Sequence, residues 1–195
     1  MSIVRPGLVV TRPSEIRVQT FRLLKHCLAS IPRPMQTEER ARRRLPHLPS
    51  LEFPNQSIIQ FVTVCTDKRR RLLNRRETAQ VLIDAWKNAD RWLVGRYVIM
   101  PDHVHFFCAP SEHPPTPLDK WVSFWRAQVT RQWPYPVEKP IWQRDFFDRQ
   151  LRSGESYHQK WLYVCENPVR AGLVSKSDEW PFQGELNVLR WHDSA

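Results

Sequence analysis

Two short apolar runs separated by only two residues place the strongest limit on the fold. Residues 96–109 read RYVIM, then Pro101 and Asp102, then HVHFFCA. Both runs are rich in β-branched and aromatic residues, which favour strands, and Pro followed by Asp is typical of a tight turn. The pattern predicts a hairpin, so the two strands must be antiparallel neighbours in a sheet.

The segments around this hairpin supply the remaining elements. The stretch SIIQFVTVCT, residues 57–66, predicts a central strand with Ile59, Phe61 and Thr63 on one face. Apolar residues recur at helical spacing in residues 76–94 and 117–133, and these segments predict two amphipathic helices, the second opened by Pro117. Residues 141–147 predict a fourth strand, and residues 155–166 predict a third helix.

The expected order is β-α-β-β-α-β-α, which is the split βαβ pattern. It predicts an α+β fold with a ferredoxin-like antiparallel sheet and helices packed on it. Prolines and arginines interrupt any periodicity near the N-terminus. We therefore expect a basic Pro/Arg-rich arm over residues 1–50, a compact domain over residues 51–182, and a C-terminal tail over residues 183–195.

The charge of the chain points to a polyanionic partner. Lys and Arg number 30 against 20 Asp and Glu, a formal net charge of +10. Much of the excess is clustered in residues 40–44, 68–71 and 75–76. Such clusters favour nucleic acid, bound in a salt-dependent manner. A solvated basic surface is the alternative, and anionic lipid is a weaker one because no basic amphipathic helix stands out.

The apolar segments and the cysteines indicate the environment of the chain. No run of about 18 apolar residues is present for a membrane span, and Arg and Pro interrupt the N-terminus before a secretory segment develops. The four cysteines are far apart and form no C-x-x-C pair, which argues against a zinc ribbon or a dense disulfide framework. We expect a cytoplasmic protein without a membrane partner, with reduced cysteines.

His103 and His105 are the first candidate functional residues. Residues i and i+2 of a strand project from the same face, so the two imidazoles would lie side by side and could hold one divalent cation. The alternative is two polar residues that face water. The H-E-x-x-H, P-C-x-x-C and G-x-S-x-G patterns are absent from the chain, which argues against those metalloenzyme and hydrolase classes.

Tyr163 and Asn167 are the second candidate pair. They are four residues apart in the third expected helix and would lie on one face of it. A phenol becomes a useful nucleophile when a base or an ion helps to ionise it, and a metal-polarised phosphate is a suitable electrophile. Asn167 could add an amide oxygen as a third ligand. Alternatively, Tyr163 packs against the sheet and Asn167 ends the helix before Pro168.

Three stretches together resemble a known family: YVIMPDHVHFF, IWQRDFFDRQLRSGE and YVCENPVRAGLV. In this order they are similar to the REP-associated tyrosine transposases of bacteria, which are single-tyrosine HUH transposases. The resemblance covers roughly residues 43–182 and implies the HUH endonuclease/transposase architecture.

The resemblance also implies a role for each candidate residue. His103 and His105 match the histidines that hold Mg²⁺ or Mn²⁺, and Tyr163 matches the nucleophile. Asn167 matches the third ligand, which is commonly Gln in insertion-sequence relatives. Asp102 stands where relatives often have Asn, so we expect it to form the turn or to support a ligating histidine.

The implied activity is metal-dependent cleavage and joining of single-stranded DNA at palindromic hairpins, through a 5′-phosphotyrosine intermediate. The alternatives are a domesticated hairpin-binding protein that cuts nothing and an unrelated H-x-H metalloenzyme acting on small molecules. Monomeric and homodimeric assembly both stay open. The basic residues that we expect to contact DNA, with surface solvation as the alternative, are Arg42, Arg43, Arg44, Lys68, Arg69, Arg70, Arg149, Arg152 and Arg170.

Overall fold

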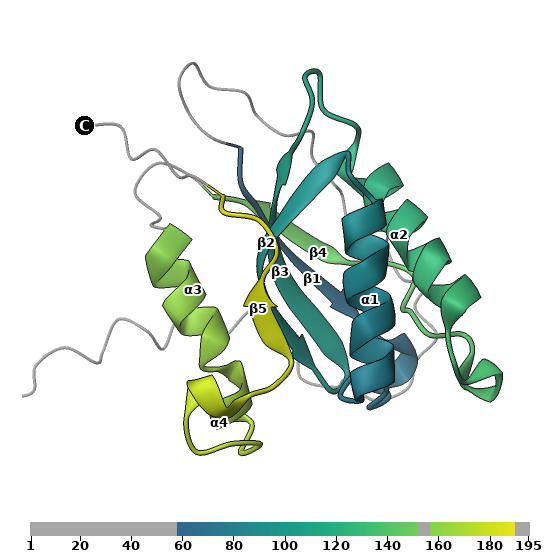
Figure 1. The fold of residues 1–195 in the computed structure, drawn as a ribbon, viewed down its shortest axis with the longest axis vertical. Helices are drawn as coiled ribbons and strands as arrows, with labels where there is room; N and C mark the ends of the chain where they lie inside the picture. The colour runs from purple at the N-terminus through teal and green to yellow at the C-terminus, as the bar shows by residue number, and fades with distance from the viewer. Residues whose placement is uncertain (1–57, 152–156, 190–195) are drawn as a thin grey trace, which may run out of the picture. The chain divides into compact units, whose positions relative to one another are not determined.

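A five-stranded antiparallel sheet organises the part of the chain that the computed structural model describes, residues 58–151 and 157–189 (Figure 1). The strands are β1 (Gln60–Cys65), β2 (Trp92–Met100), β3 (His103–Pro110), β4 (Phe147–Gln150) and β5 (Gln183–Glu185). The helices are α1 (Arg76–Asn88), α2 (Leu118–Gln132), α3 (Tyr157–Cys165) and α4 (Asn167–Arg170). Short 3-10 turns lie at η2 (Asp67–Arg69), η3 (Pro136–Glu138) and η4 (Ser177–Glu179).

The strand order confirms the predicted fold class. The sheet runs β4-β1-β3-β2-β5, and every neighbouring pair is antiparallel. β1, α1 and β2 form a βαβ unit whose two strands are separated by β3, which is the split βαβ arrangement. The predicted hairpin is present as β2 and β3, with Met100 opposite His103 across the turn at Pro101 and Asp102.

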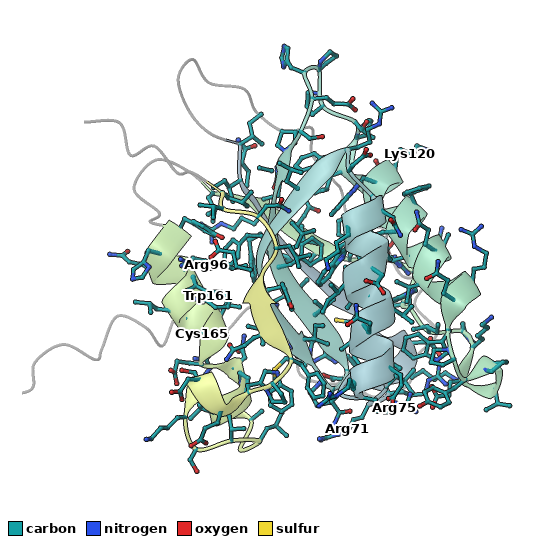
Figure 2. All side chains as sticks on the ribbon, viewed as in Figure 1. Arg71, Arg75, Arg96, Lys120, Trp161 and Cys165 are labelled. Atoms are coloured by element: carbon teal, nitrogen blue, oxygen red, sulfur yellow. The ribbon has the colours of Figure 1, made fainter. Side chains whose placement is uncertain are left out.

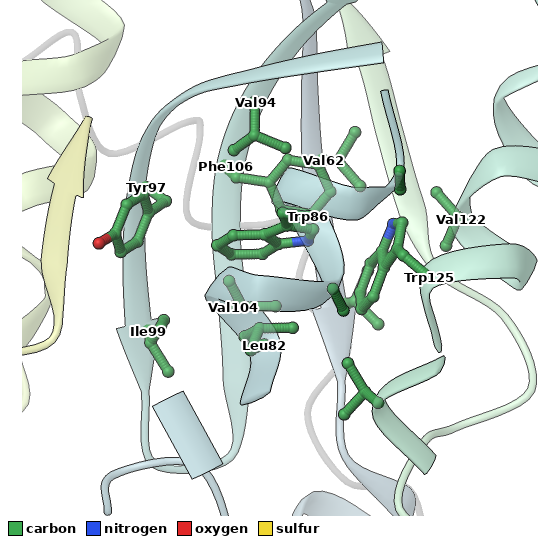
Figure 3. Close-up of a cluster of buried hydrophobic side chains, with 14 of the residues drawn as sticks. Val62, Leu82, Trp86, Val94, Tyr97, Ile99, Val104, Phe106, Val122 and Trp125 are labelled. Carbon is green, nitrogen blue, oxygen red and sulfur yellow. The ribbon is translucent and has the colours of Figure 1, made fainter. Parts of the chain in front are cut away.

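Alternation along β3 divides the interior into two cores. Val104, Phe106 and Cys108 project into a core shared with α1 and α2 (Figure 3). Phe107 projects to the other face and packs with Tyr157 and Val164 of α3. Because side chains alternate between the faces of a strand, the odd-numbered residues of β3, including both histidines, lie on the α3 face of the sheet.

Contacts from β2 hold α3 on this face. Tyr157 packs edge-on against Phe107 with ring centroids 4.9 Å apart, and its hydroxyl accepts a hydrogen bond from the Arg96 backbone N–H at 3.3 Å. The Arg96 guanidinium lies 5.4 Å from the Tyr157 ring and 5.6 Å from the Trp161 ring (Figure 2). α3 is therefore anchored at its start, and its last two turns continue along the sheet face that carries the histidines.

The predicted end of the first helix and the predicted position of the fourth strand need correction. The first helix was expected to reach residue 94, but α1 ends at Asn88 and β2 begins at Trp92. Trp92 of β2 already pairs with Pro110 of β3, and the next residue of β2, Leu93, is 38% exposed. Pairing with β3 overrides the helical periodicity of the sequence, because it gives hydrogen-bond partners to backbone N–H and C=O groups that would otherwise be buried without them. The fourth strand is displaced from residues 141–147 to Phe147–Gln150, and only Trp142 makes an isolated bridge, to Thr66.

Several predictions concern the ends of the chain. The arm over residues 1–50, its arginines Arg42, Arg43 and Arg44, the domain start at residue 51 and Arg152 all lie outside the described residues. Residues 183–185, expected in a tail, form β5 against β2, and Leu189 is buried in the core under α3.

No helix in the described ranges is both long and apolar enough to cross a membrane. Cys65, Cys108 and Cys165 are free thiols.

Replacement of Trp125 by Ala should strongly destabilise the fold. Its side chain is fully buried, and its ring centroid lies between 5.6 and 6.3 Å from those of Trp86, Phe106, Trp121 and Trp142. Removing a buried indole leaves a large cavity, which costs about 3–5 kcal/mol of unfolding free energy. Denaturant titration measures the loss. The matched control is Phe124→Ala, because the neighbouring ring is 53% exposed and should cost within about 0.5 kcal/mol; equal losses for the two variants would contradict the assignment of this core.

Candidate active site

The two histidines of β3 form a converging pair on the α3 face of the sheet. The Nε2 atoms of His103 and His105 lie 3.0 Å apart, and the rings are nearly perpendicular at 81°. The two nitrogens thus face each other at hydrogen-bond distance. The common face of the imidazoles agrees with their i and i+2 spacing, and their expected role as metal ligands stays a prediction.

Asp102 orients His103 from behind. Its Oδ1 lies 2.6 Å from the Nδ1 of His103, and its Oδ2 lies 2.8 Å from the Nε of Arg69. Burial alone would raise the pKa of Asp102, but the hydrogen bond and charge of His103 and the charge of Arg69 outweigh it and hold the pKa below 3.8. An ionised Asp102 can accept a hydrogen bond from the Nδ1–H of His103, which orients the ring with its Nε2 toward His105.

His105 is held in a similar way by β1. The Oγ1 of Thr63 lies 2.8 Å from its Nδ1, and Phe61 stacks on its ring with centroids 5.5 Å apart. Burial lowers the pKa of His105 well below 6.5, and the charges of His103, Arg69, Arg170 and Lys160 lower it further. His105 is therefore neutral near pH 7. When its Nδ1–H is donated to Thr63, its Nε2 carries a lone pair that can accept a hydrogen bond from the Nε2–H of His103 or bind a cation.

The separation of the two histidines suits a hydrogen bond between them and also a shared cation. A hydrogen bond between two ring nitrogens and two cis ligands of an octahedral ion with bonds of about 2.1 Å both give about 3.0 Å, which is the distance between the two Nε2 atoms. In residues 58–151 and 157–189, no group of three or more His, Cys, Asp or Glu side chains could hold a metal ion. A third protein ligand from these residues would therefore be of another kind, such as an amide oxygen.

Tyr163 and Asn167 lie on two consecutive helices rather than on one. α3 ends at Cys165 and α4 begins at Asn167. Pro168 explains the break, because it has no N–H to donate to the carbonyl four residues earlier and its ring crowds that carbonyl. Glu166 keeps helical angles between the two helices (φ −79°, ψ −2°), so the four-residue spacing still brings the two side chains to one end of α3.

Arg170 connects these two residues. Its Nη2 donates to the Oδ1 of Asn167 and to the backbone carbonyl of Tyr163, both at 2.6 Å, and its guanidinium lies 4.3 Å from the centre of the Tyr163 ring. The phenol itself is 43% exposed. The amide oxygen of Asn167 keeps a second lone pair beside the bond to Arg170, so the expected role of Asn167 as a ligand stays a prediction.

Lys160 lies between the histidine pair and the tyrosine. Its Nζ is 5.4 Å from the ring centroid of Phe61, which stacks on His105, and 5.9 Å from that of Tyr163. The charges of Lys160 and Arg170 both act on His105. Sequence reasoning selected neither Lys160 nor Thr63, although Lys160 is one helical turn before Tyr163 and Thr63 shares a strand face with Phe61.

The basic residues of the expected DNA surface have different surroundings. Lys68 and Arg69 take left-handed backbone angles (φ 53° and 56°), and this turn brings Arg69 back to Asp102, so Arg69 supports the histidine site. Arg70 donates to the carbonyls of Asp67 and Pro140. Arg149 is exposed on β4 and Arg170 is exposed beside Tyr163. The structure thus brings Arg69 and Arg170 to the candidate site, and their contact with DNA stays a prediction.

Known proteins are similar in sequence to this chain over less than half of its length, although no protein-family profile matches it. The REP-associated tyrosine transposase of Escherichia coli (strain K12) is 29% identical over 90 residues, which are 46% of this chain and 52% of that protein. A putative REP-associated tyrosine transposase of Haemophilus influenzae is 27% identical over 95 residues, 43% of this chain and 53% of that protein. The chain resembles the REP-associated tyrosine transposases. The matches span about half the length of these curated relatives.

A solved structure extends the resemblance to the fold. It is described as a REP-associated tyrosine transposase bound to a REP hairpin, and it superposes with a TM-score of 0.55 over 68% of this chain and 79% of that chain, at 22% identity. The agreement confirms the α+β architecture predicted for a relative of the REP-associated tyrosine transposases.

Proton titration of His105 should reveal the burial and charge of the site. Its imidazole should take up a proton only well below pH 6.5 in NMR spectra recorded with a chelator. Below about pH 6.5 His105 then binds a proton in the unfolded state but not in the folded state. The unfolding free energy therefore falls as the pH drops through that value. Lys160→Met should raise the pKa of His105 because one neighbouring positive charge is lost, whereas Lys120→Met on α2 should leave it unchanged. Titration of wild-type His105 at 6.5 would contradict the assignment.

Proposed function

We propose that this chain cleaves and rejoins single-stranded DNA at palindromic hairpins, with Tyr163 as the nucleophile and a divalent cation, Mg²⁺ or Mn²⁺, held by His103 and His105. The observation that carries the proposal is the position on one sheet face of two imidazoles whose Nε2 atoms lie 3.0 Å apart and of a helix that presents an exposed tyrosine. The resemblance to REP-associated tyrosine transposases supports it.

The histidine pair would supply two ligands and Asn167 would supply a third. When bound, the cation would polarise the scissile phosphate. Asp102 and Thr63 contact the Nδ1 atoms of the two proposed ligands and orient the rings, so little rearrangement is needed on binding.

In the proposed cleavage step the Oη of Tyr163 forms a bond to phosphorus and the bond from phosphorus to the 3′ oxygen breaks. The phenolic proton passes to water, and the 3′ oxygen takes up a proton from water and leaves as a hydroxyl.

Positive side chains would stabilise the charge on the phosphate. Lys160 is placed between the histidines and Tyr163, and Arg170 covers one face of the phenol ring. Preoriented charges that face a developing anion are effective because they need no reorganisation during the reaction. In this proposal Arg170 also positions the nucleophile through its bonds to Asn167 and to the Tyr163 carbonyl.

The proposed partner is single-stranded DNA that folds into hairpins of the repetitive extragenic palindrome type. The formal charge of +10 favours a polyanion. The related structure is described as bound to a REP hairpin. Because the phosphotyrosine keeps the energy of the broken phosphodiester, a second 3′-hydroxyl can attack it and rejoin strands without ATP.

Covalent trapping tests the proposal. Wild-type protein with Mn²⁺ and hairpin-bearing single-stranded DNA should form a covalent adduct, seen as a shifted band on denaturing gels. Tyr163→Phe should abolish the adduct, because the nucleophilic oxygen is missing, and should keep hairpin binding. His103→Ala or a chelator should also abolish it. Tyr135→Phe is the matched control, because this tyrosine packs under Arg75 and against the core shared with α1 and α2, and it should form the adduct normally.

The non-cleaving alternative gives a different result in the same experiment. A domesticated hairpin-binding protein would bind hairpins equally well with His103→Ala or with a chelator. It would form no adduct across a panel that includes palindromes flanking the reading frame. That outcome would overturn the proposed cleavage.

The charge of Lys160 has its own test. Lys160→Met should slow adduct formation on the order of 10²-fold, the usual effect of removing one preoriented group at a developing anion, whereas Lys160→Arg should retain most of the rate. Hairpin affinity should change little in either variant. Lys120→Met, on α2 across the sheet (Figure 2), should match the wild type. Equal rates for Lys160→Met and Lys120→Met would remove Lys160 from the mechanism.

A further inference from the structure

β4 places an exposed aromatic ring in line with the histidine pair. Thr63 of β1 pairs with Phe147 of β4 on one side and with His105 of β3 on the other. Residues directly opposite each other in an antiparallel sheet project from the same face. Phe147, Thr63 and His105 therefore form one row across the sheet, on the face that carries α3.

The next row along the strands carries a positive charge. Phe61 pairs with Arg149 of β4 and with Phe107 of β3, so Arg149 lies on the same face as Phe147. Two strand spacings of about 4.8 Å separate Phe147 from His105 at their backbones, roughly 10 Å. A ring and a guanidinium thus lie beside the candidate site, within the length of a short stretch of unpaired DNA.

The exposure of Phe147 is not explained by packing. Its ring is 51% exposed, whereas Phe146 is 6% exposed in the core shared with α1 and α2. The tryptophans are mostly interior as well, and the buried ones are Trp86, Trp92, Trp121, Trp125, Trp133, Trp142 and Trp180. Phe147 lies on β4, which is the edge strand of the sheet among the described residues. Single exposed apolar side chains are common on protein surfaces. Phe147 differs from them because it lies in the same row across the sheet as His105.

We propose that Phe147 is a stacking platform for an unpaired base next to the phosphate held at the histidine pair, and that Arg149 contacts the adjoining backbone phosphate. This inference rests on the proposed function and names where the single strand lies. The occupant is unpaired DNA because an exposed ring with Arg149 two residues along the same strand face combines a π-face with positive charge, the pairing that binds single strands. Stacking accepts every base, so Phe147 fixes the position of the strand rather than its sequence.

Single-position abasic substrates test this inference. The probe is a hairpin with single-stranded flanks in which each flanking nucleotide is replaced in turn by an abasic one, and affinity is measured by fluorescence anisotropy with the full-length chain. Phe147→Ala should weaken binding of the intact probe roughly 5- to 150-fold, the range for loss of one stacked base, and Phe147→Trp should retain it. Phe124→Ala is the matched control, because that ring is 53% exposed on α2, and it should bind as the wild type does.

Coupling between the variant and the substrate identifies the base. One abasic position should weaken wild-type binding by the same factor as Phe147→Ala, and the two changes together should cost no more than either alone. The inference is overturned if Phe147→Ala and the wild type bind the intact probe with equal affinity. It is also overturned if the losses of affinity from Phe147→Ala and from the abasic nucleotide add fully at every abasic position. A change of oligomeric state in Phe147→Ala, measured by sedimentation, also overturns it, because β4 would then be a contact between copies of the chain.

The readouts separate this inference from the proposed function. If Phe147→Ala couples to one abasic position but the wild type forms no covalent adduct, Phe147 is a stacking platform and the proposed cleavage is overturned. If the adduct forms normally but no abasic position couples to Phe147→Ala, only the role of Phe147 is overturned. A chain that binds none of these DNAs would overturn both.

Discussion

The position of β3 between β1 and β2 is the constraint on which the other features depend. β3 is hydrogen-bonded along both sides, from His103 to Cys108 against β1 and from His103 to Pro110 against β2. This register directs Val104, Phe106 and Cys108 into one core and both histidines to the opposite face. A slip of one residue would exchange the faces. It would bury two imidazoles among the tryptophans of α1 and α2, so core packing and site geometry select the same register.

The chemistry of the site follows from partial burial on that face. Desolvation and nearby positive charges keep His105 neutral, which is the state that can donate a lone pair to a cation. Asp102 stays ionised because His103 and Arg69 compensate for its burial. The positive charge that disfavours a protonated histidine also suits a phosphate, so one electrostatic environment serves both the proposed cation site and the proposed DNA substrate.

Much of the fold could be predicted because period-2 and period-3.6 patterns are local. The hairpin at Pro101 and Asp102 and the buried face of α2 follow from such patterns and are confirmed. The end of α1 was wrong, because residues 89–94 continue a helical pattern and only pairing with β3 shows that Trp92 begins a strand. The fourth strand was displaced for a similar reason: Ile141, Trp142 and Phe146 pack into a core, whereas the residues that pair with β1 begin at Phe147.

Local sequence patterns set the order of the elements, the common face of His103 and His105, and the spacing of Tyr163 and Asn167, because each depends on neighbours within a few residues. Which side chains meet across the sheet depends instead on tertiary contacts. Thr63 and Phe61 support His105 from β1, Lys160 lies between the two halves of the site, and Phe147 enters the row of His105 from β4. These contacts join residues far apart in the chain, and strand register and helix docking set them, neither of which is encoded in local periodicity.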